Sequence, residues 1–264
     1  MNAPLRDGGS LSYELVGSGP LVLLVRPLGG TMALWGEFRT RLAAEFRVLS
    51  FDLRGTGGSR SASAWSTTRG LARDVVALLD HLEIAKTHVF GISLGSMISQ
   101  WLAIDAPSRV DRLCLASTCA RGIEATRAGL RREIALAACF LRRREEVEPH
   151  VIGRVLSHRF RTEQPDEVGR IEAVVRVDPS SRATLATHGL AAVLHDARSE
   201  LSSIAAPTLV LAGSLDMLIG PAPARAVSTA IPGSTFETIA DAGHDLTLEQ
   251  PVATARRVAE HLRA

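Results

Sequence analysis

Short apolar runs alternate with amphipathic stretches along most of this chain. Such runs are typical of strands that are buried on both faces of a sheet, and they cover residues 21–25, 47–52, 88–92, 110–116 and 207–212. Between them, apolar residues recur at helical spacing, as in residues 71–82. Strands that alternate with helices across short glycine-rich loops predict an α/β fold with a mostly parallel, doubly wound sheet.

Both ends of the chain fit this scheme. Residues 1–16, with Gly8-Gly9 as the turn, predict an edge hairpin. Near the other end, a strand at residues 234–239 should follow a helix at residues 222–230. A single final helix over residues 246–262 should then bury Val252 on its inner side.

The alternation stops between residues 120 and 201. This stretch has helical patterns, for example at residues 128–141 and 168–177, but no strand pattern. It is also rich in arginine, at Arg121, Arg127, Arg131, Arg132, Arg142, Arg143 and Arg144. We therefore expect a core domain formed by residues 1–119 and 202–264, with residues 120–201 as a helical cap inserted over the sheet.

The composition argues against a nucleic-acid-binding protein or a membrane protein. With 264 residues, 46% hydrophobic and 22% charged, the chain resembles an ordinary globular protein, and a net charge of +2 does not favour nucleic acid as a partner. The first residues lack a signal-peptide pattern, and no apolar run reaches the roughly 20 residues that span a bilayer. We expect a cytoplasmic monomer or homodimer without a membrane partner. Scattered Cys114, Cys119 and Cys139 suggest neither a disulfide framework nor a metal site.

One motif carries candidate chemistry, Gly91-Ile-Ser-Leu-Gly95. It lies between a predicted strand and a predicted helix, where G-x-S-x-G forms a sharp, strained turn that only small flanking residues allow. The turn would hold Ser93 at the carboxyl end of the sheet, beside a helix N-terminus that stabilises anions. A chance match is the alternative, since the pattern alone is loose.

A serine hydroxyl needs a base, and the base needs an acid that orients it. In an open parallel sheet both belong in loops at the carboxyl ends of strands. Among eight histidines, only His244 lies in a loop just after a core strand, and Asp216 directly follows the strand before it. Taken singly, His244 could cap the last helix and Asp216 could form an Asx-turn, but the order Ser93, Asp216, His244 favours a catalytic triad. Asp245 competes with Asp216, although it adjoins the histidine and reaches back to its ring with difficulty.

Acyl transfer also needs an oxyanion hole. One donor should be the backbone N–H of Leu94, directly after Ser93. The other should come from the loop after the strand at residues 21–25, where Leu28 is the natural choice.

The chain resembles the α/β-hydrolase fold superfamily in four segments, which are Phe51-Asp-Leu-Arg-Gly-Thr-Gly-Gly-Ser59, Gly91-Ile-Ser-Leu-Gly95, Gly213-Ser-Leu-Asp216 and Asp241-Ala-Gly-His-Asp-Leu-Thr-Leu-Glu-Gln-Pro251. The resemblance implies a mostly parallel eight-stranded sheet with a helical cap. Within the superfamily the chain looks most like 3-oxoadipate enol-lactonases and related lactonases and esterases, through Pro27-Leu-Gly-Gly-Thr31 with Trp35, Gly95-Ser-Met-Ile-Ser-Gln-Trp-Leu102 and Arg112-Leu-Cys-Leu-Ala-Ser-Thr118. Those enzymes open a small lactone without a metal or organic cofactor.

Two positions depart from the superfamily pattern. Arg26-Pro27 replaces the usual His-Gly, so the oxyanion loop is braced differently; Pro27 lacks an N–H, but the donor needed is on Leu28. Arg26 is either a surface-loop residue, which we favour, or a contact for an anionic substrate group. Ser96 stands where glycine is common, and it is still small. Further candidate pocket residues are Met32, Trp35, Trp101, His188 and His195.

Together these features predict a serine hydrolase that cleaves a small carboxylic ester or lactone. The arginines of the cap could bind a carboxylate, so the substrate could carry one. Hydrolysis of a C–C bond or cofactor-free perhydrolysis on the same triad are the alternatives within the fold. A non-catalytic ligand-binding member of the fold is the alternative from another class.

Overall fold

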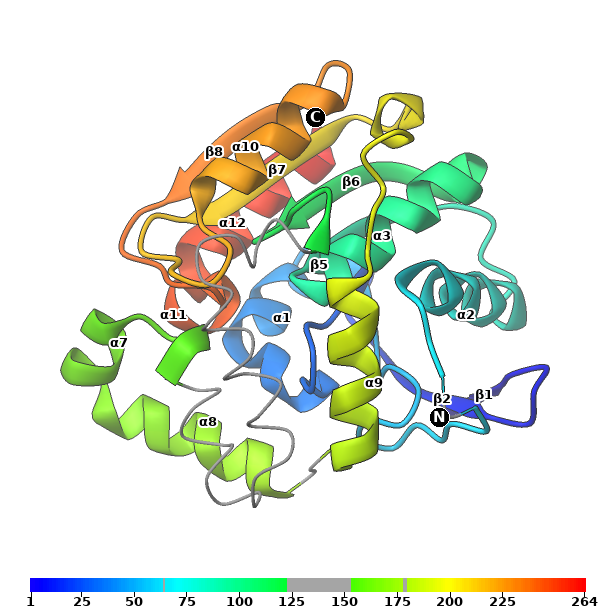
Figure 1. The fold of residues 1–264 in the computed structure, drawn as a ribbon, viewed down its shortest axis with the longest axis horizontal. Coiled ribbons are helices and arrows are strands. Elements are labelled where there is room, and N and C mark those ends of the chain that lie inside the picture. Colours follow the sequence, from blue (N-terminus) through cyan, green and yellow to red (C-terminus); the bar gives the residue numbers. More distant parts are fainter. Residues whose placement is uncertain (64, 123–152, 178–179) are drawn as a thin grey trace.

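The computed structural model describes residues 1–63, 65–122, 153–177 and 180–264, and their strands form one eight-stranded sheet (Figure 1). The strands are β1 (Asn2–Pro4), β2 (Ser10–Val16), β3 (Leu21–Val25), β4 (Arg47–Phe51), β5 (Thr87–Ile92), β6 (Val110–Ala116), β7 (Thr208–Gly213) and β8 (Thr235–Ile239). Their order is β1-β2-β4-β3-β5-β6-β7-β8. The two pairs that involve β2 are antiparallel and all other pairs are parallel, which confirms the predicted sheet and its edge hairpin.

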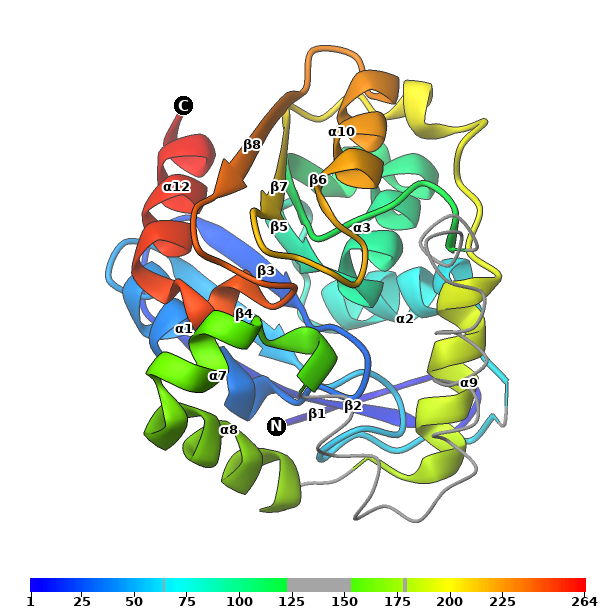
Figure 2. The ribbon, with the colours of Figure 1, turned by 60° about the vertical axis from the view of Figure 1, so that its left-hand side comes forward.

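Helices cover both faces of this sheet, as the doubly wound pattern predicts (Figure 2). One face carries α1 (Gly36–Leu42) and α12 (Pro251–Arg263), and the other carries α2 (Thr68–His81), α3 (Leu94–Asp105) and α10 (Pro221–Ala230). Successive residues of a strand face opposite sides of a sheet. In β3, Val22 and Leu24 therefore join the core under α1 and α12, whereas Leu23 and Val25 join the core under α2 and α3.

One helical prediction needs correction. The final helix is broken into α11 (Leu246–Glu249) and α12, because Pro251 has no N–H to donate and disfavours helical geometry at Gln250. Val252 then lies in the first turn of α12 and is 49% exposed, so its predicted burial is wrong. A 3-10 turn, η1 (Met32–Trp35), directly precedes α1.

Described residues between β6 and β7 are helical. They form α7 (His158–Glu163), α8 (Pro165–Val177), α9 (Arg182–Val193) and the short turn η3 (Leu201–Ser203); a further short turn, η2 (Pro107–Arg109), precedes β6. Figure 2 places α7 and α8 on the side of α1, and α9 on the side of α2. The helix predicted at residues 128–141 lies outside the described residues, and so do six of the seven arginines named in the sequence analysis, all but Arg121. Within the described part of the chain, no helix is both long and apolar enough to span a bilayer.

The two ends of the inserted segment lie side by side and are joined by backbone hydrogen bonds. The Gly122 N–H donates to the His195 carbonyl at 2.8 Å, and the Ala197 N–H donates to the Ala120 carbonyl at 2.9 Å. We propose on this basis that residues 120–201 form the cap, and that residues 1–119 and 202–264 form the core.

Candidate active site

The turn between β5 and α3 holds Ser93 in a strained backbone conformation. Its φ of 55° and ψ of −121° lie in a region that non-glycine residues rarely adopt. Two hydrogen bonds hold the turn, since the Ser93 N–H donates to the Ala116 carbonyl at 2.9 Å and the Ser93 carbonyl accepts from the Ser96 N–H at 2.9 Å. Ser93 thus projects from the carboxyl end of a central strand.

Neither flanking position of this turn has room for a side chain. A Cβ atom on Gly91 would lie 2.4 Å from the Gly95 carbonyl oxygen, and one on Gly95 would lie 2.1 Å from the Val25 carbonyl oxygen. Ser96 is tolerated where glycine is common, because its hydroxyl donates to the Ser93 carbonyl at 2.6 Å. The spacing of the motif therefore follows from the close approach of β5, α3 and β3.

Ser93, Asp216 and His244 meet at this edge of the sheet. His244 Nε2 lies 2.8 Å from Ser93 Oγ, and His244 Nδ1 lies 2.9 Å from Asp216 Oδ2. The other oxygen of Asp216 accepts the backbone N–H groups of Leu218 and Ile219 at 2.8 and 3.1 Å. His244 and Asp216 are buried, whereas Ser93 is half-buried.

The surroundings stabilise the imidazolium that forms when His244 takes up a proton, and they keep Asp216 ionised. Burial alone would lower the pKa of His244, but the charge and hydrogen bond of Asp216, together with Asp245 and Glu249, raise that pKa above its ordinary value. Burial alone would raise the pKa of Asp216, but His244 and the two N–H donors hold it below its usual range. His244 is therefore suited to accept a proton from Ser93.

Two backbone supports of His244 were not predicted. The Ser117 hydroxyl donates to the His244 carbonyl at 2.6 Å, and the His244 N–H donates to the Val155 carbonyl at 3.0 Å. Ser117 has a positive φ of 48° directly after β6, at the same sheet edge as Ser93. Its place after a core strand is the sequence signal that could have identified it. Val155 belongs to the cap, and the sequence carries no signal for its contact.

Leu28 and Leu94 occupy the places expected of oxyanion donors. Leu94 begins α3, and Leu28 lies in the loop after β3, the strand that pairs with β5. Neither backbone N–H donates to another residue in the described part of the chain. The Gly30 N–H donates to the Pro27 carbonyl at 3.1 Å, which folds the loop into a turn around Leu28.

Arg26 is not a surface residue, so that interpretation is wrong. Its side chain is 1% exposed, and its Nη2 lies 2.9 Å from Asp245 Oδ2. The guanidinium also lies 4.5 Å from the centre of the Trp35 ring. Asp245 therefore faces Arg26, whereas Asp216 faces the His244 ring, and the competing candidate for the acid is excluded by these contacts. Arg26 is too enclosed to meet a substrate anion.

Trp101 and His195 belong to a buried polar chain between the cap and the core. Trp101 Nε1 donates to Thr68 Oγ1 at 3.1 Å, Thr68 Oγ1 lies 3.0 Å from His195 Nδ1, and His195 Nε2 lies 3.2 Å from Gln100 Oε1. Every donor in this series of hydrogen bonds has an acceptor when the Thr68 hydroxyl donates to His195 Nδ1 and His195 Nε2–H donates to Gln100 Oε1. Burial lowers the pKa of His195 to about 4, so its ring is neutral. These contacts indicate packing rather than substrate binding.

The other three pocket candidates differ from one another. Trp35 is fully buried against Phe38 and Phe90, which makes it a core residue. Met32 is half-buried, and its N–H donates to Asp52 Oδ1 at 2.7 Å. His188 is buried in α9, where burial first and the Arg54 charge second lower its pKa to about 4. Its Nδ1 is buried without a hydrogen-bond partner among the described residues, and the same holds for Nε1 of Trp35.

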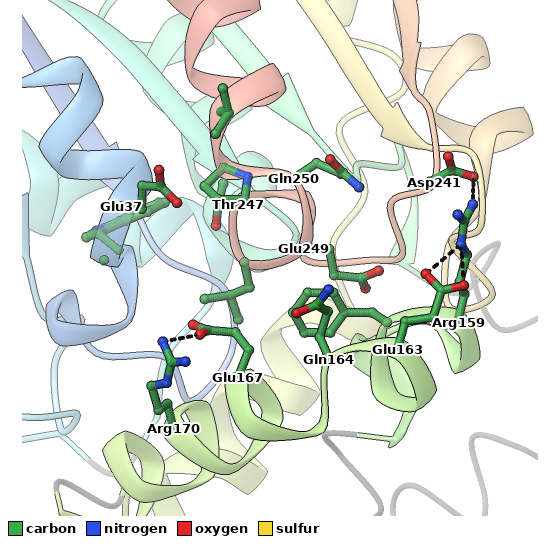
Figure 3. A pocket seen from close by; sticks show the side chains of 16 residues that line it. Glu37, Arg159, Glu163, Gln164, Glu167, Arg170, Asp241, Thr247, Glu249 and Gln250 are labelled. Atoms are coloured by element: carbon green, nitrogen blue, oxygen red, sulfur yellow. Dashed lines mark hydrogen bonds and ion pairs between the residues drawn. The ribbon is translucent and has the colours of Figure 1, made fainter.

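A separate cavity of about 700 Å³ lies between α7 and α8 on one side and α1 and α11 on the other (Figure 3). Several of its charged groups form ion pairs with one another, as Arg159 does with Asp241 at 2.5 Å and Arg170 does with Glu167 at 2.6 Å. Ser93, Asp216 and His244 do not line it. In the described ranges, no group of three or more His, Cys, Asp or Glu side chains could hold a metal ion.

Comparison with known proteins identifies the family of this chain. Residues 20–251 match the family model of the alpha/beta hydrolase fold. A 3-oxoadipate enol-lactonase of Acinetobacter baylyi is 29% identical over 250 residues, which cover 92% of this chain and 90% of that protein. Two solved structures superpose over 100% of this chain: the enol-lactonase of Burkholderia xenovorans (26% identity, TM-score 0.86, 100% of that chain) and an esterase of Thermogutta terrifontis (28% identity, TM-score 0.87, 97% of that chain). This chain belongs to the α/β-hydrolase fold family.

Proposed function

We propose that this protein is a serine hydrolase that cleaves a small carboxylic ester or lactone through an acyl-enzyme. One observation carries the proposal: His244 lies between Ser93 and Asp216, with 2.8 Å to the hydroxyl and 2.9 Å to the carboxylate. That arrangement supplies a nucleophile, a base and an orienting acid in hydrogen-bond contact.

In the proposed first step, Ser93 Oγ attacks the substrate carbonyl carbon while His244 Nε2 takes the hydroxyl proton. Asp216 holds Nδ1–H, which selects the tautomer whose Nε2 has a free lone pair. The protonated His244 then gives its proton to the leaving alkoxide oxygen as the C–O bond breaks. In a lactone the alkoxide stays on the same molecule, because the ring opens.

Water completes the proposed cycle. His244 takes a proton from water, the resulting hydroxide attacks the acyl-enzyme carbonyl, and Ser93 leaves with the proton returned by His244. The Leu28 and Leu94 N–H groups would hold the oxyanion in both steps. Support for this role comes from their positions just after the adjacent strands β3 and β5, and from the absence of another acceptor for either N–H among the described residues. Each such donor contributes about 3 kcal/mol of transition-state stabilisation.

The substrate class is inferred from the relatives. Two of them are named enol-lactonases and one is named an esterase, so we propose an enol-lactone-like ester as the substrate. The sequence further favours a cytoplasmic monomer or homodimer, and these properties remain predictions.

Covalent labelling and turnover together test the proposal. The intact protein is treated with a fluorophosphonate probe and assayed with p-nitrophenyl acetate and an enol-lactone. We expect stoichiometric labelling and turnover of both substrates. Ser93→Ala should abolish both while the protein stays folded, whereas Ser202→Ala, at an exposed serine outside the site, should keep both.

Each alternative gives a different result. Failure to label wild-type protein would indicate a non-catalytic binding member of the fold. Cleavage of a vinylogous diketone in preference to both esters would indicate a C–C bond hydrolase. Peracid formation from acetate and peroxide at a rate above ester turnover would indicate a perhydrolase.

A further inference from the structure

Arg26 directly follows β3, and its guanidinium is buried among groups from three segments of the chain. Its Nη2 lies 2.9 Å from Asp245 Oδ2, and its Nη1 lies 3.5 Å from Thr247 Oγ1. The Trp35 ring covers one face of the guanidinium at 4.5 Å. Burial lowers the pKa of Arg26, while Asp245 and Asp52 oppose that shift, so the side chain stays charged.

The loop that carries Leu28 is folded against this guanidinium. A Cβ atom on Gly30 would lie 2.9 Å from Arg26 Nε and 3.2 Å from Nη2, so only glycine lets the loop approach so closely. The Gly30 N–H closes the turn on the Pro27 carbonyl at 3.1 Å. The Leu28 N–H is thereby placed by a turn that rests on Arg26.

The other partner of the ion pair adjoins the proposed base. Asp245 follows His244, and the N–H groups of both residues donate to the Val155 carbonyl at 3.0 and 3.2 Å. Asp245 Oδ1 accepts the Thr247 N–H at 3.2 Å, so the carboxylate is fixed on both sides. One buried ion pair therefore joins the loop of Leu28 to the loop of His244, across 219 positions of sequence.

We propose that Arg26 and Asp245 are positioning residues: their ion pair fixes the Leu28 loop against the His244 loop, and Arg26 neutralises the charge of Asp245 beside His244. This inference rests on the proposed function. Stability alone does not explain the pair, because well-packed apolar residues in place of a buried ion pair are often equally stable.

The charged groups around His244 in the described residues come from three places. Asp216 lies after β7, Asp245 and Glu249 belong to the loop and helix that follow His244, and Arg26 lies after β3. Asp52, after β4, faces Arg26. The cap contacts at Val155 and Ser157 are uncharged. The positive charge of Arg26 thus compensates part of the negative charge of these carboxylates.

Removal of the positive charge of Arg26 and removal of the negative charge of Asp245 should shift the pH profile of kcat/KM in opposite directions. Since neutral His244 is the base, kcat/KM rises with pH through the pKa of His244. Arg26→Met leaves Asp245 uncompensated, which should raise the midpoint by about half a pH unit or more. Asp245→Asn leaves Arg26 uncompensated and should lower it. The double variant should return the midpoint to the wild-type value.

Geometry and charge can be separated with a conservative variant. Arg26→Lys keeps the cation but loses the planar fork, so the midpoint should stay while kcat/KM falls about tenfold. The matched control is Arg41→Met, which removes an exposed ion pair with Glu37 and should change neither quantity.

The measurements are kcat/KM for p-nitrophenyl acetate from about pH 5 to about pH 9 and NMR titration of the His244 ring. An unchanged midpoint and an unchanged ring titration in Arg26→Met and Asp245→Asn would overturn the proposal, as would shifts of the same sign. If Arg26→Met does not fold, a lowered midpoint in Asp245→Asn supports the proposal and an unchanged one overturns it. Wild-type protein without turnover would refute the proposed function instead, and the NMR titration would still test the ion pair.

Discussion

Glu249 binds Ser157 through both of its carboxylate oxygens. Oε1 accepts the Ser157 backbone N–H at 2.7 Å, and Oε2 accepts the Ser157 hydroxyl at 2.6 Å. Glu249 ends α11, just after the His244 loop, whereas Ser157 caps the N-terminus of α7. Burial raises the pKa of Glu249 although both hydrogen bonds from Ser157 oppose that shift. This contact fastens the cap to the segment that holds the proposed base.

Removal of this carboxylate should destabilise the protein. Glu249→Ala leaves a buried N–H and a buried hydroxyl without their acceptor, which costs about 1–3 kcal/mol in free energy of unfolding. Urea denaturation measures the change. Glu37→Ala, which breaks an exposed ion pair with Arg41, is the control and should have no measurable effect. Equal stability of the two variants would show that the contact contributes nothing.

Glycine at the turn of Ser93 should be far less replaceable than glycine in the cap. Gly95→Ala places a methyl group 2.1 Å from the Val25 carbonyl oxygen and should cost about 3 kcal/mol or more. Gly169→Ala, inside α8 with no atom within 4 Å, should instead add about 0.5–1 kcal/mol through helix propensity. Calorimetry measures the thermal stability of both variants. Similar changes in stability would contradict the close approach of Gly95 to the Val25 carbonyl.

Acid should destabilise the protein through His195. Its pKa in the folded protein is about 4, below the ordinary value of 6.5, so the unfolded chain takes up the proton first. The contribution of neutral His195 to the free energy of unfolding is therefore fully present above about pH 6.5. It is lost as the pH falls towards 4, by about 3 kcal/mol at most.

Urea unfolding at several pH values in that window measures the effect. His195→Gln should reduce the dependence on pH and leave the part that comes from His188, whose pKa is also about 4, whereas His158→Gln, at an exposed position, should leave the dependence as in wild type. An unaltered slope in His195→Gln would mean that the neutral buried imidazole is not the source.

Much of the fold and three site residues could be predicted from local patterns. Wholly apolar runs mark the central strands because both faces of the sheet are covered, and β3 to β7 follow those runs. Ser93, Asp216 and His244 lie in the turns and loops that follow β5, β7 and β8, and the parallel pairing of the strands brings these ends together. Asp216 was preferred to Asp245 on chain geometry, and it is the residue at 2.9 Å from the His244 ring.

Contacts between distant segments escaped prediction. Arg26 carries no local sign that its partner lies 219 residues away, and an arginine in a loop is usually exposed. His195 similarly lies against Thr68, 127 positions earlier. Pairings of this kind depend on how helices and loops dock, which hydrophobic periodicity does not encode. The break at Pro251, by contrast, was readable from the residue itself.

The two backbone hydrogen bonds at Gly122 and Ala197 bring the ends of the inserted segment together on the core. Loop-closure entropy grows only slowly with length, so a segment between two such fixed anchors can lengthen or shorten at small cost to folding. A cap grafted from a relative onto these anchors should leave the sheet and the Ser93 turn as they are. Substrate range could then diverge in this lineage by exchange of one module, without renewed selection on the core.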